Sequence, residues 1–305
     1  NPERLDINIK FEDYQKIEFA RQKAIELGTL ISTDEDYVPA TIIHDGKEYD
    51  VKLRLKGDLP DHWEGKKWSL RVKVKNDSLF GMTVFSIQDP KTRQEINEMV
   101  YQNALREEGV IGLRYKFVQI FINGEGKGIY ALEEHFSKEL IENNSRREGV
   151  ILKFDESLFF ERSVKTPNIE IETSEEFYAS PVIVFENEQK LMSDAVRAGE
   201  LRTAISLLEE LRNGTLQSHQ IFDVDKTAKY YALSTLMNCP HGKSWHNSRI
   251  YYNPVTSLLE PIGFDGNCRR EGAQEALQEY VPKCIYFSNS SDCPFEAADY
   301  SDLIL

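Results

Sequence analysis

Residues 49–75 have the sequence YDVKLRLKGDLPDHWEGKKWSLRVKVK, in which two strand-like runs flank a short turn-rich segment. In the second run, residues 68–75, apolar side chains alternate with polar or charged ones. This alternation is typical of a β-strand with one buried face. The first run, residues 49–57, alternates in the same way, so that Lys52, Arg54 and Lys56 share a face. Together the two runs predict adjacent strands of a sheet whose polar face is cationic.

Outward from these runs, residues 1–134 are predicted to form a twisted antiparallel sheet that carries one or two helices. Residues 12–28 have helical apolar spacing and end at Gly28, and residues 92–108 form a second candidate helix. The tetrapeptide Asn123-Gly124-Glu125-Gly126 is a strong hairpin signal. Further strands are predicted at residues 37–43, 116–122 and 128–134.

Residues 135–305 are predicted to be mainly helical. Helices are predicted at residues 135–144, 183–198, 200–213 and 224–238, and short strands at residues 149–154, 248–252 and 259–264. The acidic stretch 155–180 is predicted to be a surface loop. A β-rich first lobe followed by a helical lobe is an α+β architecture.

The composition is that of a globular protein that is not a general nucleic-acid binder. The chain has 305 residues, 40% of them hydrophobic, which is enough to bury a sizeable core. Its formal net charge of −14 opposes binding to a polyanion, although a local basic pocket is compatible with it. No apolar run approaches the roughly 20 residues of a membrane span. The first residues, NPERLDINIKF, do not have the pattern of a signal peptide, and the compartment stays open.

The four cysteines all lie in the last part of the chain, at Cys239, Cys268, Cys284 and Cys293. One or two disulfides are compatible with these positions, but four cysteines allow three pairings and the sequence does not choose among them. Free thiols in a reducing compartment are an equally good interpretation.

Two groups of charged residues in the first half are candidates for phosphate binding. The strand faces that carry Arg54 and Lys56, and Arg71 and Lys73, could hold a polyphosphate together with the turn at Gly57. A solvated sheet face is the alternative. A glutamate of the predicted helix 92–108 could pair with one of these cations, and ordinary helix-surface glutamates are the alternative there.

The second half contains the most specific pattern. Asn247 precedes the predicted strand 248–252 and Asp265 follows the predicted strand 259–264, so a hairpin would bring the two side chains together. Magnesium prefers hard oxygen ligands, usually one or two protein groups plus phosphate oxygens. The pattern therefore predicts a metal site at Asn247 and Asp265, with two polar caps of a hairpin as the alternative.

In this order, the motifs resemble the CotH kinase family, the bacterial spore-coat-type atypical protein kinases. The resemblance covers essentially the whole chain and rests above all on VKLRLKGD, KKWSLRVKV, VQIFINGEGKGIYALEEHF and WHNSRIYYNPVTSLLEPIGFDG. It implies a divergent two-lobed kinase-like fold, with a β-rich N-lobe over residues 1–134 and a mainly helical C-lobe over residues 135–305. It also implies ATP and Mg²⁺ or Mn²⁺ as cofactors. The implied acceptors are Ser/Thr hydroxyls of proteins, coat or surface proteins among them, or of the kinase itself.

The resemblance also implies roles for individual residues that bind the nucleotide. Arg54, Lys56 and Gly57 resemble the turn that covers the nucleotide, and Arg71 or Lys73 resembles the cation that pairs with its phosphates. Glu98, or else Glu95, resembles the helix partner of that cation. Glu133 and Glu134 resemble the segment beside the adenine.

For the catalytic part, the resemblance implies that Asn247 and Asp265 are the metal ligands, but two positions depart from the family's pattern. No Asp lies between Cys239 and Asn247, where members commonly carry one, and Asn267 replaces a second acid. His241 or His246 could serve as the base instead, since imidazole titrates near neutrality.

Two other functions are alternatives to a protein kinase. One is an inactive relative that acts as a coat or surface scaffold, and the other is an enzyme that transfers AMP in place of phosphate. The resemblance favours a cell-surface, secreted or spore-coat location over the cytoplasm.

Overall fold

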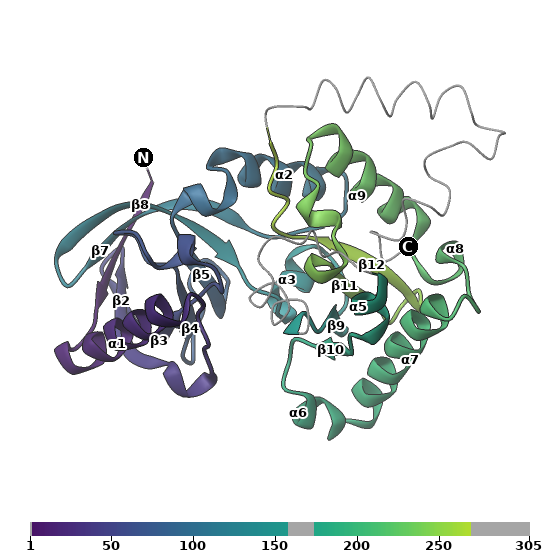
Figure 1. Ribbon diagram of the computed structural model, residues 1–305, viewed down its shortest axis with the longest axis horizontal. Helices are drawn as coiled ribbons and strands as arrows, with labels where there is room; N and C mark the ends of the chain where they lie inside the picture. The colour runs from purple at the N-terminus through teal and green to yellow at the C-terminus, as the bar shows by residue number, and fades with distance from the viewer. Residues whose placement is uncertain (1, 158–173, 270–305) are drawn as a thin grey trace. The chain divides into compact units, whose positions relative to one another are not determined.

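The chain divides into two compact units, which the computed structural model describes over residues 2–157 and 174–269 (Figure 1). One unit comprises residues 1–99 and 113–140, and the other comprises residues 100–112 and 141–305. The N-terminal part is rich in strands and the C-terminal part in helices. The predicted α+β class is therefore confirmed.

The helices and strands have the following bounds. In the N-terminal part they are β1 Glu3–Asn8, α1 Phe11–Leu27, η1 Asp34–Asp36, β2 Val38–His44, β3 Lys47–Leu55, η2 Pro60–His62, β4 Leu70–Val74, β5 Val84–Gln88, η3 Pro90–Arg93, α2 Ile96–Glu107, β6 Ile111–Gly112, β7 Tyr115–Ile122 and β8 Glu125–Glu134. They continue with α3 Lys138–Asn143, β9 Ile151–Phe154, α5 Ser174–Ala179, β10 Val182–Val184, α6 Glu188–Met192, α7 Ala195–Arg212, α8 Ser218–Ile221, α9 Val224–Leu236, η4 His241–Lys243, η5 Trp245–Asn247, β11 Arg249–Asn253 and β12 Leu258–Gly263.

The first unit contains a closed barrel with the strand order β1-β2-β3-β4-β5-β8-β7. The pairs expected in the predicted twisted antiparallel sheet are antiparallel, but β1 pairs in parallel with β7 and closes the sheet into a barrel, which the sequence did not predict. This strand was not predicted, although its Leu5 and Ile7 are fully buried. Closure leaves no sheet edge with unpaired backbone groups.

The cationic strand face is confirmed by the register of β3 and β4. Arg54 lies opposite Arg71, and Lys52 lies opposite Lys73. The alternate residues of β3, including Val51 and Leu53, are fully buried in the apolar core of this unit. The period of two in the sequence therefore places the apolar set in the core and the charged set on the other face.

In the second unit, the sheet order is β10-β9-β11-β12-β6, with β11 and β12 forming the predicted hairpin. Its apolar core includes side chains from α7 and from β9, β11 and β12. The helix α7 begins where the Asp194 carboxylate accepts hydrogen bonds from the backbone N–H groups of Val196 and Arg197. Such a cap satisfies amide groups that have no partner inside the helix.

Three predicted element boundaries were wrong. The predicted helix 92–108 begins at Ile96, because Gln94 and Glu95 have positive φ angles of 54° and 58° that interrupt a helix. The predicted helices 183–198 and 200–213 also have other bounds, because β10 pairs with β9 at the start of the first, the short helix α6 follows, and one helix, α7, spans Ala195–Arg212.

Within the predicted loop 155–180, residues Ser174–Ala179 form α5, and residues 158–173 lie outside the described residues. The same holds for Cys284 and Cys293.

Candidate functional site

The first candidate site is a buried ion-pair cluster around Lys56, at the end of β3. The Nζ atom of Lys56 donates to Oε1 of Gln88 at 2.7 Å and to Oε1 of Glu133 at 3.1 Å. On the other carboxylate oxygen, Glu133 accepts from Nε2 of Gln88 at 3.1 Å and from Nε of Arg93 at 3.3 Å. Lys56, Arg93 and Glu133 are all less than one-tenth exposed. Buried charges are tolerated because they are paired in this way.

The pKa of Lys56 is lowered from 10.5 to about 8. Burial is the main cause, and the charges of Arg93 and Arg71 act in the same direction, while Glu133 partly opposes them. Burial disfavours the charged form of an amine, and neighbouring cations add to that effect. The cluster therefore holds a lysine whose proton is unusually easy to remove.

Arg71 of β4 and His135, the residue after β8, form a second pair. The Nη1 atom of Arg71 lies 2.5 Å from Nδ1 of His135. Since a guanidinium can only donate, Nδ1 accepts and the imidazole is neutral. Burial and the charge of Arg71 lower the pKa of His135 well below its ordinary 6.5. Burial likewise lowers the pKa of Arg71, to about 10.

The two cations that the sequence suggests as partners of the helix glutamate have other contacts. In the described part of the chain, Arg71 bonds to His135, and Lys73 bonds to Asp34 at 3.0 Å, so neither cation pairs with Glu98. Lys56 pairs with Glu133 of β8, and the role of each cation toward a phosphate stays a prediction. Glu98 is nevertheless fully buried, while Glu95 is exposed.

Glu98 lies near the same cluster, as the environment of Tyr115 shows. The pKa of Tyr115 is raised first by burial and then by the charges of Glu133 and Glu98. Glu134, the neighbour of Glu133, is occupied by an ion pair with Arg114. Adenine binding by Glu133 and Glu134 remains a prediction.

Gly57 forms the turn that follows Lys56, as the sequence predicts. Its φ angle is +98°, which an L side chain rarely adopts, and a Cβ atom there would lie 2.1 Å from Cγ of His62. The carbonyl oxygen of Gly57 accepts from Nε1 of the buried Trp63 at 3.1 Å. The turn is thus held against the segment after it and admits only glycine.

Arg54, the third residue assigned to this turn, points elsewhere. Its Nη1 atom donates to the hydroxyl of Ser32 and to the carbonyl of Leu55, and its guanidinium lies over the ring of Tyr37.

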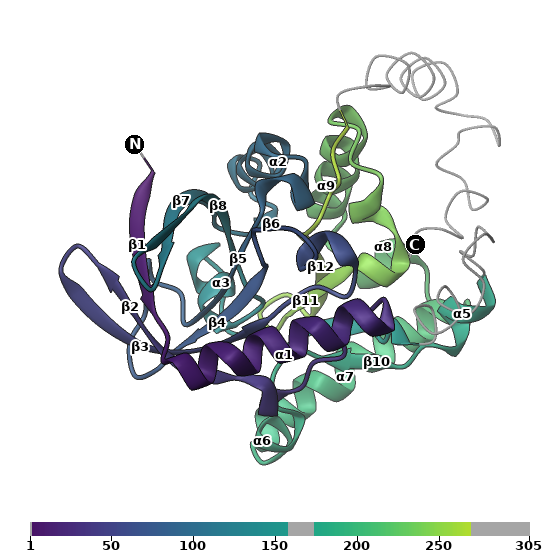
Figure 2. The same ribbon diagram turned by 60° about the vertical axis from the view of Figure 1, so that its left-hand side comes forward.

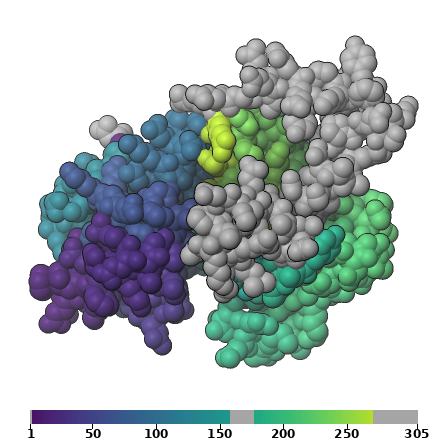
Figure 3. Space-filling view, in the orientation of Figure 1, coloured from purple at the N-terminus to yellow at the C-terminus, as the bar shows by residue number. Residues whose placement is uncertain are grey.

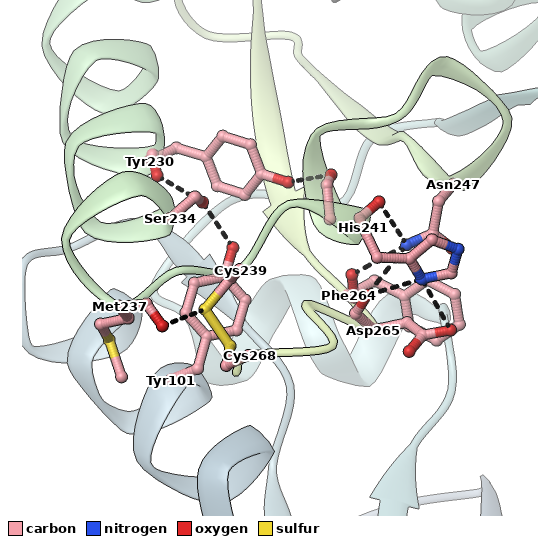
Figure 4. Close-up of a disulfide and its surroundings, with 11 residues drawn as sticks. Tyr101, Tyr230, Ser234, Met237, Cys239, His241, Asn247, Phe264, Asp265 and Cys268 are labelled. Atoms are coloured by element: carbon pink, nitrogen blue, oxygen red, sulfur yellow. Dashed lines mark hydrogen bonds and ion pairs between the residues drawn. A yellow bond between two sulfur atoms is a disulfide. The ribbon is translucent and has the colours of Figure 1, made fainter. Parts of the chain in front are cut away.

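The second candidate site lies in the other unit and brings Asn247 and Asp265 together (Figure 4). The Nδ2 atom of Asn247 donates to the carbonyl oxygens of His241, Phe264 and Asp265, each at 3.2 Å. These contacts fix the amide so that Oδ1 points away from the carbonyls. Asn247 is 5% exposed, and Asp265 has a φ angle of +45°. The predicted hairpin therefore does bring the two residues together, and their role as metal ligands stays a prediction.

The two histidines of this loop have different environments. His241 is about one-third exposed, and its Nδ1 lies 3.1 Å from the carbonyl and 3.4 Å from Oδ2 of Asp265. His246 is buried, which together with the charge of His241 lowers its pKa from 6.5 to about 4. His246 is therefore neutral at physiological pH, and His241 is the one closer to solvent.

The donor set around Asn247 and Asp265 fits a metal that shares its coordination with a phosphate. Among the described residues, no group of three or more His, Cys, Asp or Glu side chains could hold a metal by itself. One carboxylate and one amide oxygen are what magnesium takes from a protein when nucleotide phosphates and water complete its shell. A structural metal site of the zinc type does not match these residues.

A disulfide between Cys239 and Cys268 fastens the segments that carry this site (Figure 4). Cys239 follows α9, and Cys268 lies three residues after Asp265. Both cysteines are almost completely buried, next to Tyr101 and Tyr230. Of the three pairings that the sequence allows, the structure shows this one, and the sequence offered no signal for it.

Replacing both Cys239 and Cys268 with alanine should lower the free energy of unfolding by about 3 kcal/mol. The reason is that the disulfide closes a loop with a sequence separation of 29 and restricts the unfolded chain. The measurement is urea unfolding in a background in which Cys284 and Cys293 are serine, with and without a reductant. An unchanged midpoint in the double variant, or no effect of the reductant on the parent, would contradict this.

Taken together, the chain is an α+β protein with a buried Lys–Glu pair in one unit and an Asn–Asp pair beside a hairpin in the other. The family model described as CotH kinase protein matches residues 53–295. The chain therefore belongs to the CotH kinase family. No curated protein matches it. None of the described helices combines the length and the apolar character that crossing a membrane requires.

Proposed function

We propose that this protein is an ATP- and divalent-metal-dependent protein kinase that transfers the γ-phosphate to Ser/Thr hydroxyls of proteins, itself included. The observation that carries the proposal is the contact between Asn247 and Asp265, in which Nδ2 of Asn247 donates to the Asp265 backbone carbonyl and so places the two residues side by side at the ends of the β11–β12 hairpin. The buried Lys56–Glu133 pair supports it, since phosphoryl transfer relies on positioned cations.

In the proposed reaction, the protein supplies position and charge. Lys56, held by Glu133, donates hydrogen bonds to phosphate oxygens, and Arg93 adds a second buried cation. Asn247 and Asp265 hold Mg²⁺ or Mn²⁺, which when bound neutralises charge on the transferred phosphate. The bond from the γ-phosphorus to the β–γ bridging oxygen breaks, and a bond from the same phosphorus to the acceptor oxygen forms.

The proton of the acceptor hydroxyl needs a base, and His241 is the better candidate of the two histidines. It is partly exposed, whereas His246 is buried. No carboxylate is available between Cys239 and Asn247. A weak base lowers the rate without abolishing transfer, because the transition state has a largely dissociative character.

Incubation of the purified protein with ATP and Mg²⁺ or Mn²⁺, followed by intact mass spectrometry, tests the proposal. We expect a mass increase of one or more phosphates, abolished by chelation of the metal. An increase equal to AMP would instead establish nucleotidyl transfer.

The second candidate function is the inactive scaffold. It is favoured because no acid lies between Cys239 and Asn247 and because Asn267 stands where the family's pattern has an acid. No mass increase in either metal, together with no transfer to a mixture of proteins and no nucleotide binding, would support the scaffold and contradict the kinase.

A further inference from the structure

A cavity of about 520 Å³ lies in the first unit, between α1 and the segment 29–39 that follows it. We call it the α1 groove. One wall is a face of α1 that includes Lys16, Phe19 and Lys23, and the opposite wall includes Ile31 and Glu35. The helix lies along this unit's surface and is seen side-on in Figure 2 and as part of the purple surface in Figure 3. None of the residues assigned above to phosphate or metal binding lines the groove.

The groove is bordered by large apolar side chains that solvent reaches. Phe19 and Ile31 are both 73% exposed, and Leu27 is 50% exposed. Ala24 and Leu30 form a buried apolar floor between them. A cavity next to protruding apolar side chains is typical of a protein interaction site.

The charges at the groove are complementary across its two walls. Lys23 stands on the helix wall and Glu35 on the opposite wall, and in the described chain neither side chain has an ion-pair partner. Their neighbours are already engaged, since Lys16 bonds to Asp13 at 2.8 Å and Asp36 caps the turn at Thr33. Lys23 and Glu35 are therefore left for a partner, together with Glu12, an exposed acid near the start of α1 that also lines the groove and has no ion pair in the described chain.

We propose that the occupant of the α1 groove is a second copy of this chain, in a twofold dimer. In this dimer, Phe19 of each copy enters the groove of the other, and Lys23 of each copy pairs with the partner's Glu35. A twofold interface brings the same surface together twice, so it must contain both a protruding group and the cavity that receives it. The α1 groove meets that condition for shape, because it has both the protruding Phe19 and a cavity, and for charge, because it has both Lys23 and Glu35. A different protein that bound here would need only the cavity.

The size of the surface predicts a reversible dimer. A helix of 17 residues is about 25 Å long, and with one neighbouring segment the patch is about 20 Å wide. This corresponds to about 500 Å² from each copy, or about 1,000 Å² in total, which is below the size of stable specific interfaces and within the range of weak, transient ones. We therefore expect a dissociation constant in the micromolar range.

Sedimentation velocity of the full chain from about 1 to 200 μM tests the proposal, at about 0.15 M salt so that the net negative charge is screened. The wild type should shift from monomer to dimer across this range. Phe19→Ala should weaken association by at least about tenfold, as expected for an aromatic group in the centre of an interface. Phe11→Ala is the matched control, because Phe11 is on the same helix and 76% exposed but does not line the groove.

A charge exchange distinguishes the second copy from any other occupant. Lys23→Glu alone and Glu35→Lys alone should each weaken the dimer, by about tenfold, because each places like charges opposite one another. The double variant should restore it, since each copy then again presents one charge of each sign. A wild type that stays monomeric at the highest concentration, or a double variant no better than the single ones, would overturn the proposal. Far-ultraviolet circular dichroism verifies that all variants are folded.

Discussion

Replacing Asp265 with asparagine is expected to reduce phosphate transfer by about a thousandfold, the scale on which a single charged group acts in phosphoryl transfer. Asparagine has the same size as aspartate but no charge, so it lowers the affinity for Mg²⁺ or Mn²⁺. The contacts that shape the loop should survive, because His241 and Asn247 both bond to the backbone carbonyl of Asp265. The effect is therefore on the metal rather than on the fold.

Two measurements on the Asp265→Asn variant separate an effect on the metal from an effect on the fold. The first is the rate of transfer, and the second is nucleotide affinity with and without the metal. The metal-dependent part of the affinity should disappear. Asp225→Asn is the matched control, because Asp225 is an exposed acid of the same unit that pairs with Lys226 and Lys229. Unchanged transfer in Asp265→Asn would remove Asp265 from the site, and equal losses in both variants would show a general effect of charge.

The proximity of Asn247 and Asp265 could be predicted from sequence because the two residues are linked by one local element. Asn247 and Asp265 lie at the two ends of a hairpin, and hairpin pairing is set by short-range turn and strand signals. The strand faces follow for the same reason, since a period of two fixes which side chains share a face. The cationic faces of the two strands are therefore adjacent as predicted, with Arg54 opposite Arg71.

The partner of Lys56 could not be predicted in this way. Lys56 and Glu133 are 77 residues apart, and their contact depends on how β3, β5 and β8 are ordered in the barrel. That order rests on the pairing of β5 with β8, two strands that are far apart in the sequence. Single-sequence patterns carry no information on such pairing. For this reason the sequence did not indicate that Gln88 and Arg93 bond to the same carboxylate, Glu133.

The disulfide and the α1 groove show two further limits of prediction from a single sequence. Cysteine spacing leaves several pairings open, and only the fold brings Cys239 to Cys268. In α1, the apolar spacing predicted a helix correctly but does not distinguish a residue that packs in the core from one that stays exposed. Ile17 is buried whereas Phe19, two residues later, is not.

Replacing Lys56 with methionine is expected to weaken nucleotide binding and transfer by about a hundredfold, the effect of removing one preorganised donor from such a site. Glu133 keeps Arg93 and Gln88 as partners, so its carboxylate is not left alone in the interior. Lys52→Met is the matched control, since Lys52 lies on the same strand face but is exposed. Equal affinity in Lys56→Met and the wild type would remove Lys56 from the nucleotide site.

The role of Lys56 can also be tested by varying the pH, because nucleotide affinity and the free energy of unfolding should change in opposite directions. Phosphate binding needs the protonated amine, so affinity should fall as the pH rises through about 8, the pKa of the folded Lys56. The unfolded lysine keeps its proton up to its ordinary 10.5. Between these values the unfolded chain binds more protons than the folded one, so the contribution of Lys56 to the free energy of unfolding rises with pH.

Nucleotide titrations and urea unfolding at pH 7, 8, 9 and 10 measure both trends on the same protein. Lys56→Met should lose both, and Lys56→Arg should retain its affinity at high pH, because a guanidinium stays charged there. If the wild type bound the nucleotide equally well throughout, a charged Lys56 would not be what holds the phosphates. If Lys56→Met kept the full pH dependence of affinity, another group would be responsible for it, and Arg71, with its pKa lowered to about 10, would be the next to replace.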